Sequence, residues 1–383
     1  MAAYPGTETE RRVPHETLES AVARIFAACG MPDACARLLA ATLADADLHG
    51  VHSHGVMRVP DYAGRLTPPE GLSAVATKIA GVRGGVNPEG RPRVVRDAGA
   101  ALVIDGDNAM GQIACDFAMD TVIERARRTG VAFAAIGNSN HCGAMAWYVR
   151  KAVAADMIGL ASTNALPTMA PWGGADRIVG MNPLGVGIPA GSEAPFVMDS
   201  AFAACARGKV VVYNQKGHAL PPGWALDRDG LPTTDPAAAL DGLLRPIGDY
   251  KGVNVAMALG IMSTMLSGAG YGTRLGNLDD GPHAGRDGQF VMALDIGALT
   301  DLAEFKREMD AVIDEIHRSR RAPGTERIYC AGELEHETAL AYRRDGIPLN
   351  DETLSDLAST AAARGVDLSD LLEAARGRTN LSI

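Results

Sequence analysis

The sequence predicts an α/β layer architecture with a helical N-terminal part. Apolar residues recur at helical spacing through residues 15–50, and helical and strand patterns alternate from residue 111 to residue 163. Alternation of this kind is typical of helices packed on a sheet. The chain has 383 residues, of which 47% are hydrophobic, so it can bury a large core and is long enough for two domains.

The first predicted unit is residues 1–75, which contain a helical hairpin over residues 15–50. Gly30 and Pro32 separate its two apolar runs, because glycine and proline interrupt helices. Gly50 is placed to end the second helix. We expect this unit to pack with residues 300–383, where a helix is predicted over residues 302–318. The second unit is residues 76–299.

The second unit begins with a predicted β-hairpin over residues 81–107. A helix (residues 111–130), a buried strand (131–137), a second helix (144–155) and a second strand (157–163) follow. Residues 171–191 are rich in glycine and proline and should form turns and short strands. Residues 252–270 carry no charge but contain polar residues and four glycines, which favours a buried helix over a membrane span. Another strand is predicted over residues 289–295.

Composition excludes several classes of partner. The formal net charge is -10, and no basic block compensates locally, so nucleic acid and acidic membrane surfaces are not expected partners. The six cysteines are scattered without a CxxC pair, which predicts reduced thiols, a cytoplasmic protein and no metal site. The first twelve residues lack the apolar run of a secretory signal.

Phosphate-binding motifs are missing. No GxGxxG opens a helix after a strand, and no Walker A sequence is present. A dinucleotide would therefore have to bind without the Rossmann fingerprint.

The densest chemical cluster is DLHGVHSHGVMRVPDY, residues 47–62. Histidine carries protons near neutral pH, serine can orient it, and arginine presents a planar fork to a carboxylate. If the segment after Gly55 is helical, His54, Arg58 and Tyr62 share one face. Two alternatives remain: solvated histidines at a helix start, and a metal site formed by His49, His52 and His54.

The second cluster is GNSNHCGAMAWY, residues 137–148, where a predicted strand ends and a helix begins. Asn140 and His141 would lie at the carboxyl end of the strand, where α/β proteins place their ligand chemistry. The residues alone leave a structural role for His141 equally open.

Seven stretches carry a specific resemblance. They are DLHGVHSHGVMRVPDY, NAMGQIACDFAMD, GNSNHCGA, GGADRIVGMNPLGVGIPA, VMDSAFAACARGKV, LPPGWALDRDGLPTTDPAAAL and KGVNVAMALGIMSTMLSGAGYG. In this order the chain resembles the type-2 malate/L-lactate dehydrogenase family, which includes ureidoglycolate, sulfolactate and 2,3-diketogulonate oxidoreductases and Δ1-piperideine-2-carboxylate reductase. The resemblance implies a non-Rossmann α/β fold, with the helical part packed on mixed sheets, and a homodimer.

The resemblance also implies catalytic roles. His54 resembles the general acid/base, with Ser53 beside it and Asp199 as an orienting carboxylate. His141 resembles a proton acceptor of some members, so the choice between the two histidines stays open. Arg58, with Tyr62 nearby, resembles the anchor of a substrate carboxylate.

The cofactor implied by the resemblance is NAD or NADP. Its contacts are expected at four short segments of the chain. They are Asn164 and Ala165; Asp199, Ser200 and Ala201; Lys251 and Gly252; and Gly332, Glu333 and Leu334. Lysine offers a compact cation for a phosphate, and glycine lets the backbone approach it. The segment here reads Lys-Gly-Val-Asn where the family more often has Lys-Gly-Tyr-Gly.

The predicted function is hydride transfer between nicotinamide and a small 2-hydroxy/2-oxo acid, such as malate or lactate, or a cyclic amino/imino acid. The rival readings are a metal-dependent hydrolase built on His49, His52 and His54 and an inactive member that binds a metabolite.

Overall fold

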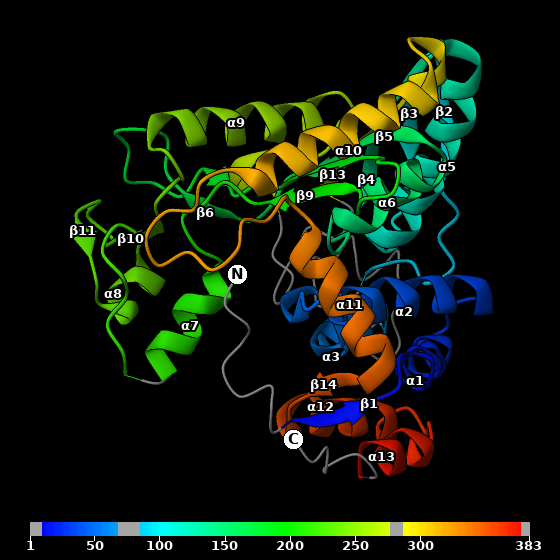
Figure 1. Ribbon diagram of the computed structural model, residues 1–383. Helices are drawn as coiled ribbons and strands as arrows, with labels where there is room; N and C mark the ends of the chain where they lie inside the picture. Colours follow the sequence, from blue (N-terminus) through cyan, green and yellow to red (C-terminus); the bar gives the residue numbers. More distant parts are fainter. Residues whose placement is uncertain (1–9, 68–84, 216, 276–285, 377–383) are drawn as a thin grey trace.

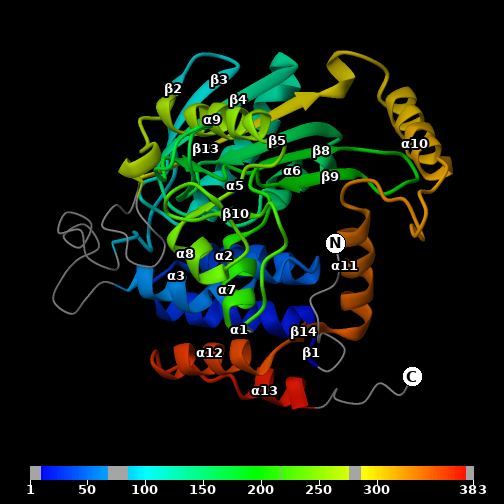
Figure 2. The same ribbon diagram turned by 90° about the vertical axis from the view of Figure 1, so that its left-hand side faces the viewer.

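The computed structural model describes residues 10–67, 85–215, 217–275 and 286–376. The predicted boundary between residues 75 and 76 lies outside these ranges. Within them, a mixed sheet forms an upper layer and a bundle of helices a lower layer (Figures 1 and 2). This is the α/β arrangement with helices and a mixed sheet that the sequence predicts.

The largest sheet of the described residues has the strand order β2-β3-β4-β13-β5-β8-β9. The β3–β4 pair is parallel, and the other neighbours in this sheet are antiparallel. The strands are β2 (Arg93–Asp97), β3 (Ala101–Asp105), β4 (Val131–Ser139), β5 (Met157–Thr163), β8 (Leu184–Ile188), β9 (Phe196–Ser200) and β13 (Asp287–Asp295). The parallel pair brings the chain segments after β3 and β4 to the same edge of the sheet.

Helices cover both faces of this sheet. On one face lie α5 (Gly111–Thr129) and α6 (Ala146–Ala154), and on the other α9 (Tyr250–Met265). The core between the sheet and α5 and α6 is built from apolar residues such as Ile104, Met119 and Val149. The helix α10 (Leu302–Arg318) has the predicted bounds, and it follows the 3₁₀ turn η5 (Ile296–Ala298).

The lower layer combines the two ends of the chain. Its elements are β1 (Arg11–Val13), α1 (His15–Ala28), α2 (Asp33–Leu48), α3 (Val59–Leu66), α11 (Glu333–Asp345), β14 (Ile347–Leu349), α12 (Asp351–Ala362) and α13 (Ser369–Arg376). Strand β1 pairs antiparallel with β14, and one apolar core joins α1, α2 and α3 to α12 and α13. Gly50 follows α2 with a φ of +73°, a conformation that glycine adopts without strain.

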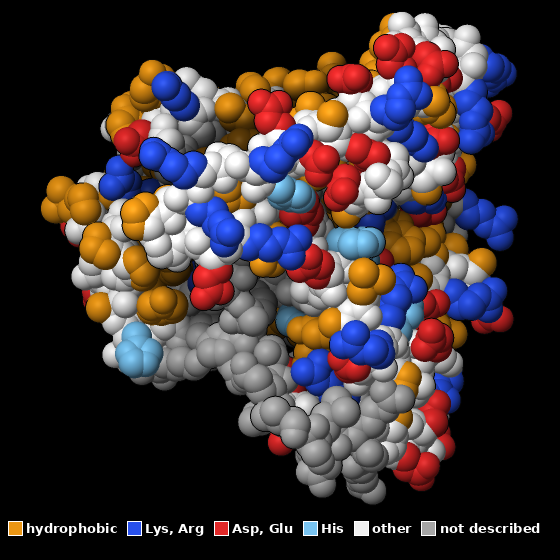
Figure 3. Space-filling model, in the orientation of Figure 1, with side chains coloured by type: hydrophobic (Ala, Val, Ile, Leu, Met, Phe, Trp, Pro, Cys, Tyr) orange, Lys and Arg blue, Asp and Glu red, His pale blue; other side chains and the backbone are white. Residues whose placement is uncertain are grey.

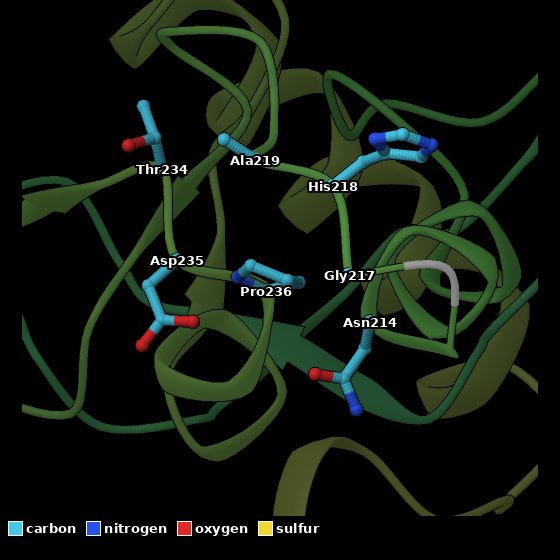
Figure 4. Close-up of a pocket in the computed structure, with 7 residues that line it drawn as sticks. All are labelled: Asn214, Gly217, His218, Ala219, Thr234, Asp235 and Pro236. Atoms are coloured by element: carbon cyan, nitrogen blue, oxygen red, sulfur yellow. The ribbon is translucent and has the colours of Figure 1, made fainter.

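A smaller lobe lies beside the sheet. It contains β6 (Pro167–Met169), β7 (Val179–Gly180), α7 (Arg207–Gln215), β10 (Ala225–Leu226), β11 (Pro232–Thr233), α8 (Pro236–Asp241), β12 (Leu243–Leu244) and the 3₁₀ turn η4 (Gly272–Arg274). A hollow of about 400 Å³ lies in this lobe, between the end of α7 and the start of α8 (Figure 4). Asp235 in its wall caps α8 through the N–H of Ala237, which gives that carboxylate a structural partner.

The expectation that residues 252–270 form a buried helix is only half right. Helix α9 buries one face, including Val253, Ala256 and Leu259, against the sheet and β7. Its opposite face is exposed and apolar, with Val255 41%, Met265 59% and Leu266 55% accessible. No helix among the described residues has the length and apolar character to cross a bilayer.

Candidate active site

The segment that carries the first histidine cluster is not one helix. It forms two 3₁₀ turns, η2 (His52–His54) and η3 (Val56–Arg58), before α3 begins at Val59. The prediction that His54, Arg58 and Tyr62 share a helical face is therefore wrong, because Gly55 adopts an extended conformation with φ -89° and ψ -155° between the turns. The bend still brings the three side chains to one region.

A buried aspartate holds this bend in place. The carboxylate of Asp47, at the end of α2, accepts the backbone N–H of Val56 at 2.6 Å and lies 2.7 Å from His52 Nδ1. A Cβ on Gly55 would lie 2.2 Å from that carboxylate, so only glycine fits beside it. Asp47 is the first residue of the histidine-rich cluster, but no sequence pattern predicted that its carboxylate would hold the bend.

His54 and His141 lie side by side. Their ring centroids are 6.0 Å apart and their planes are inclined by 22°, although 87 positions separate them in the chain. The structure places His141 two residues after β4, at the edge of the sheet reached by the parallel strands β3 and β4. Both rings are half-buried.

Each ring has a polar partner on Nδ1. Ser53 Oγ lies 2.9 Å from Nδ1 of His54, and the phenol of Tyr62 lies 2.7 Å from Nδ1 of His141. The Gly143 N–H also donates to His141 Nδ1, at 3.2 Å, so that nitrogen acts as an acceptor. This pattern favours a neutral His141 whose proton is on Nε2.

Tyr62 and Asp199 have partners that the sequence did not predict. Tyr62, expected near the substrate, is fully buried, and its hydroxyl accepts a hydrogen bond from Gln112 at 3.1 Å while it contacts His141. No sequence pattern marks Gln112, in the NAMGQ stretch, because a glutamine in a helix is not distinctive. Asp199, expected to orient a histidine, instead accepts the N–H of Ala146 at the start of α6 at 3.0 Å. Ser53 is the observed partner of His54.

Arg58 gives the region a positive charge. Its Nε donates to the carbonyl of Ser53 at 2.9 Å and Nη1 to Asp61 at 3.3 Å, while Nη2 has no hydrogen bond among the described residues. Burial, followed by this guanidinium, lowers the pKa of His54 to about 4. Burial, followed by His54 and then Arg58, lowers the pKa of His141 to about 3. Both imidazoles are therefore neutral near pH 7.

The predicted cofactor segments fall into two groups. Ala165 is tied to α9, because Asn182 accepts the N–H of Ala165 and donates to the carbonyl of Ala256. The side chain of Asn164 donates to the carbonyl of Gly270 and accepts the N–H of Gly288. Lys251 and Gly252 lie in the first turn of α9, where the Lys251 side chain is exposed and makes no ion pair with a described residue.

The second group surrounds β9. Ser200 belongs to this strand, Ala201 follows it, and Val197 donates its N–H to the carbonyl of Ala331 just before α11. Gly332 has a φ of +93° and packs so tightly on Val197 that a Cβ would lie 2.9 Å away. Glu333 and Leu334 open α11, where the carboxylate of Glu333 folds back to the N–H of Cys330 at 3.0 Å.

The histidines proposed for a metal-dependent hydrolase do not converge. His49 is bonded to the carbonyl of Asp45 at 2.8 Å and His52 to Asp47. In the part of the chain that the structure describes, the three imidazoles do not form a group able to hold a metal ion. This geometry contradicts the hydrolase reading.

Comparisons with known proteins agree with the resemblance. The model of the malate/L-lactate dehydrogenase family matches residues 13–358. L-sulfolactate dehydrogenase of Methanocaldococcus jannaschii is 35% identical over 90% of this chain and 94% of that protein. A reductase of Δ1-pyrroline-2-carboxylate and Δ1-piperideine-2-carboxylate from Pseudomonas putida is 30% identical over 88% of this chain and 95% of its own length.

Solved structures give the same result at the level of the fold. The sulfolactate dehydrogenase of M. jannaschii superposes with a TM-score of 0.84 and 32% identity over 94% of this chain and 99% of that one. The malate dehydrogenase of Pyrococcus horikoshii gives a TM-score of 0.82 at 32% identity over 94% and 97%. The chain therefore belongs to the malate/L-lactate dehydrogenase family and is an oxidoreductase.

Proposed function

We propose that this protein transfers hydride between NAD or NADP and a small 2-hydroxy/2-oxo acid or a cyclic amino/imino acid. The observation that carries the proposal is the pair of stacked, neutral histidines beside the guanidinium of Arg58. Relatives named for sulfolactate, malate and cyclic imino acids support this range of substrates.

In the proposed site, Arg58 binds the substrate carboxylate. Nη2 of Arg58 has no hydrogen-bond partner among the described residues, so it can donate to a carboxylate oxygen while Nε keeps its bond to the carbonyl of Ser53. The carboxylate would then lie beside both imidazoles. A neutral imidazole can take the hydroxyl proton during oxidation, and an imidazolium can return it to the oxygen or nitrogen during reduction.

Nicotinamide supplies the hydride acceptor or donor when it is bound. Two features of the chain suit its phosphates: the N-termini of α9 and α11 both lack a side-chain cap, and helix N-termini favour anions. Lys251 would add a cation at the first, and the backbone of Gly332, Glu333 and Leu334 would serve the second. Asn164, Ala165, Ser200 and Ala201 would line the space between them.

We further propose that the protein is a cytoplasmic homodimer. The exposed face of α9 supports a dimer, because it presents Val255, Ile261, Met262, Met265 and Leu266 at helical spacing without a charge. Hydrophobic side chains follow the upper edge of the molecule where α9 runs (Figure 3).

A panel of substrates tests the proposal. Purified protein is mixed with NADH or NADPH and with each of several 2-oxo acids and cyclic imino acids, and nicotinamide absorbance is followed. Oxidation of the reduced cofactor by at least one acid is expected, and Arg58→Ala should abolish it. If no acid consumes either cofactor while both bind, the protein is a binding member that lacks catalysis.

A further inference from the structure

Three residues from separate elements meet at the junction of α10 and α11. His317 lies in the last turn of α10, Cys330 lies near the end of the connection that follows, and Glu333 is the first residue of α11. Their imidazole nitrogen, thiol sulfur and carboxylate oxygen all lie within 4.8 Å of one another. The connection loops out from α10 and returns to the start of α11 (Figures 1 and 2). None of the three residues takes part in the proton chemistry proposed above, and Glu333 belongs to the proposed cofactor site only through its backbone.

The polar atoms of this cluster are buried but incompletely bonded. Cys330 is 8% exposed and Glu333 is 5% exposed. His317 Nε2 lies 2.7 Å from Glu333 Oε1, yet this buried nitrogen forms no hydrogen bond in the described part of the chain. The oxygen is therefore not where a ring N–H would point, and the nitrogen is left without a directed partner. A buried polar atom without a partner calls for an explanation, and an ion is one.

The donor set matches a particular metal. Thiolate, imidazole and carboxylate together are ligands of zinc, whereas magnesium and calcium take oxygen ligands alone. Ligand atoms on a tetrahedral zinc ion lie roughly 3.3–3.6 Å apart, given bond lengths of about 2.0–2.3 Å. In the present cluster the three ligand atoms lie within 4.8 Å of one another, and His317 Nε2 and Glu333 Oε1 are 2.7 Å apart, so an ion would have to separate these two atoms by less than about 1 Å.

We propose that His317, Cys330 and Glu333 bind one Zn²⁺ ion, with water as the fourth ligand. The Cys330 thiol releases its proton to solvent as the sulfur–zinc bond forms. Arg327 lies 3.9 Å from Glu333 Oε2 but is held by Glu337 at 2.6 Å and is half-exposed, so it can remain at the rim. The sequence predicted no metal site, because the spacing H-x₁₂-C-x₂-E matches no common zinc motif.

Such an ion would fasten the connection between α10 and α11. That connection carries Gly332, which packs on Val197 of β9. Zinc would therefore fix the start of α11 relative to both α10 and the edge strand of the sheet. An ion that binds the folded chain and not the unfolded chain stabilises the folded state. Zinc should therefore also raise the melting temperature.

The test measures metal binding in the full chain without substrate or cofactor. Protein freed of metal with a chelator is incubated with Zn²⁺, passed through gel filtration and analysed for zinc. A parallel sample takes Co²⁺, whose thiolate charge-transfer absorption reports sulfur ligation. The variants are Cys330→Ser and His317→Gln, and the matched control is Cys205→Ser, since Cys205 is equally buried at 8%.

One zinc per chain is expected in the wild type and in Cys205→Ser, with loss to background in both site variants. The cobalt charge-transfer band should disappear in Cys330→Ser. His317→Gln keeps the test decisive if Cys330→Ser does not fold, because His317 lies at a partly exposed helix end. Absence of zinc from the wild type, or equal zinc in the wild type and His317→Gln, overturns the proposal. The substrate panel is run without added zinc, so failure of the zinc proposal and failure of the proposed function are distinguishable.

Discussion

At the scale of single residues, burial and nearby positive charge determine the protonation of His54 and His141, the proposed acid/base residues. His54 and His141 are both neutral near pH 7, because burial and then nearby positive charge lower their pKa values to about 4 and about 3. The free protein is therefore ready to accept a proton but rarely ready to donate one. This asymmetry predicts different pH profiles for the two directions of the reaction.

The first prediction is that kcat/KM for oxidation stays flat from about pH 6 to pH 8, because the basic form dominates throughout. For reduction, kcat/KM should fall about tenfold for each pH unit over the same range, because it requires the imidazolium of the free enzyme. Steady-state kinetics in both directions measure this. A reduction rate that does not change between pH 6 and pH 8 would show that neither histidine donates the proton.

The two histidines can be separated by substitution. His54→Ala should lower kcat by ~10²–10⁴-fold if His54 is the general acid/base, with cofactor affinity unchanged. His141→Ala is the matched variant, since its ring is stacked on the same site. The variant with the larger loss of kcat identifies the proton carrier. Near-normal turnover in both variants would contradict a histidine acid/base mechanism.

Arg58 tests the recognition of the substrate. Arg58→Lys keeps the charge but cannot reproduce the planar fork, so KM for acid substrates should rise at least about tenfold, whereas cofactor Kd should not change. Kinetics and cofactor titration of the same preparation give both values. If the variant loses cofactor affinity and keeps its KM for the acid, Arg58 binds the cofactor and not the substrate carboxylate.

These residues also show what could be predicted from the sequence. Histidines, a serine and an arginine within sixteen positions indicate proton and carboxylate chemistry, and the structure does bring His54, Arg58 and His141 together. The bonding of each ring could not be predicted. Whether Ser53 or Asp199 contacts His54 depends on the fold of Gly55 and on the placement of β9, which no local pattern encodes.

At the scale of elements, periodicity predicts regular helices and strands well, because side-chain direction follows local geometry. The bounds of α10 agree with the sequence, and the alternation from α5 to β5 follows the predicted order. The pairing of β13 between β4 and β5 cannot be predicted from local patterns, since more than a hundred residues separate β13 from the other two strands. Long-range order of this kind depends on the packing of the whole sheet.

The N-terminus of α9 provides the test at this scale. If Lys251 contacts a cofactor phosphate, Lys251→Ala should weaken NADH or NADPH binding by about tenfold, as expected for a charge-assisted hydrogen bond. Added salt should weaken the wild type more than the variant. Lys306→Ala is the control, because Lys306 pairs with Asp156 and lies on α10. Titration calorimetry that gives equal affinities and equal salt dependence would show that Lys251 faces only solvent.

At the scale of the whole molecule, the exposed apolar face of α9 would be buried if a second copy of the chain packed against it. The uncharged stretch of α9 indicates burial, but the single chain buries only the face that packs on the sheet. Hydrophobicity alone cannot distinguish a helix in a core from a helix in an interface, because both remove apolar area from water. Oligomeric state therefore lies beyond what the sequence pattern can decide.

The last prediction follows from that exposed face. Met265→Glu, at a position that is 59% exposed, should leave the fold intact but convert a dimer into a monomer, because a carboxylate cannot be buried without a partner. Leu299→Glu is the matched control, since Leu299 is 71% exposed but lies just after η5, away from α9. Sedimentation velocity should give a dimer for the wild type and the control and a monomer for Met265→Glu. A dimer that survives the α9 substitution would place the interface on another surface, and a monomeric wild type would exclude the homodimer.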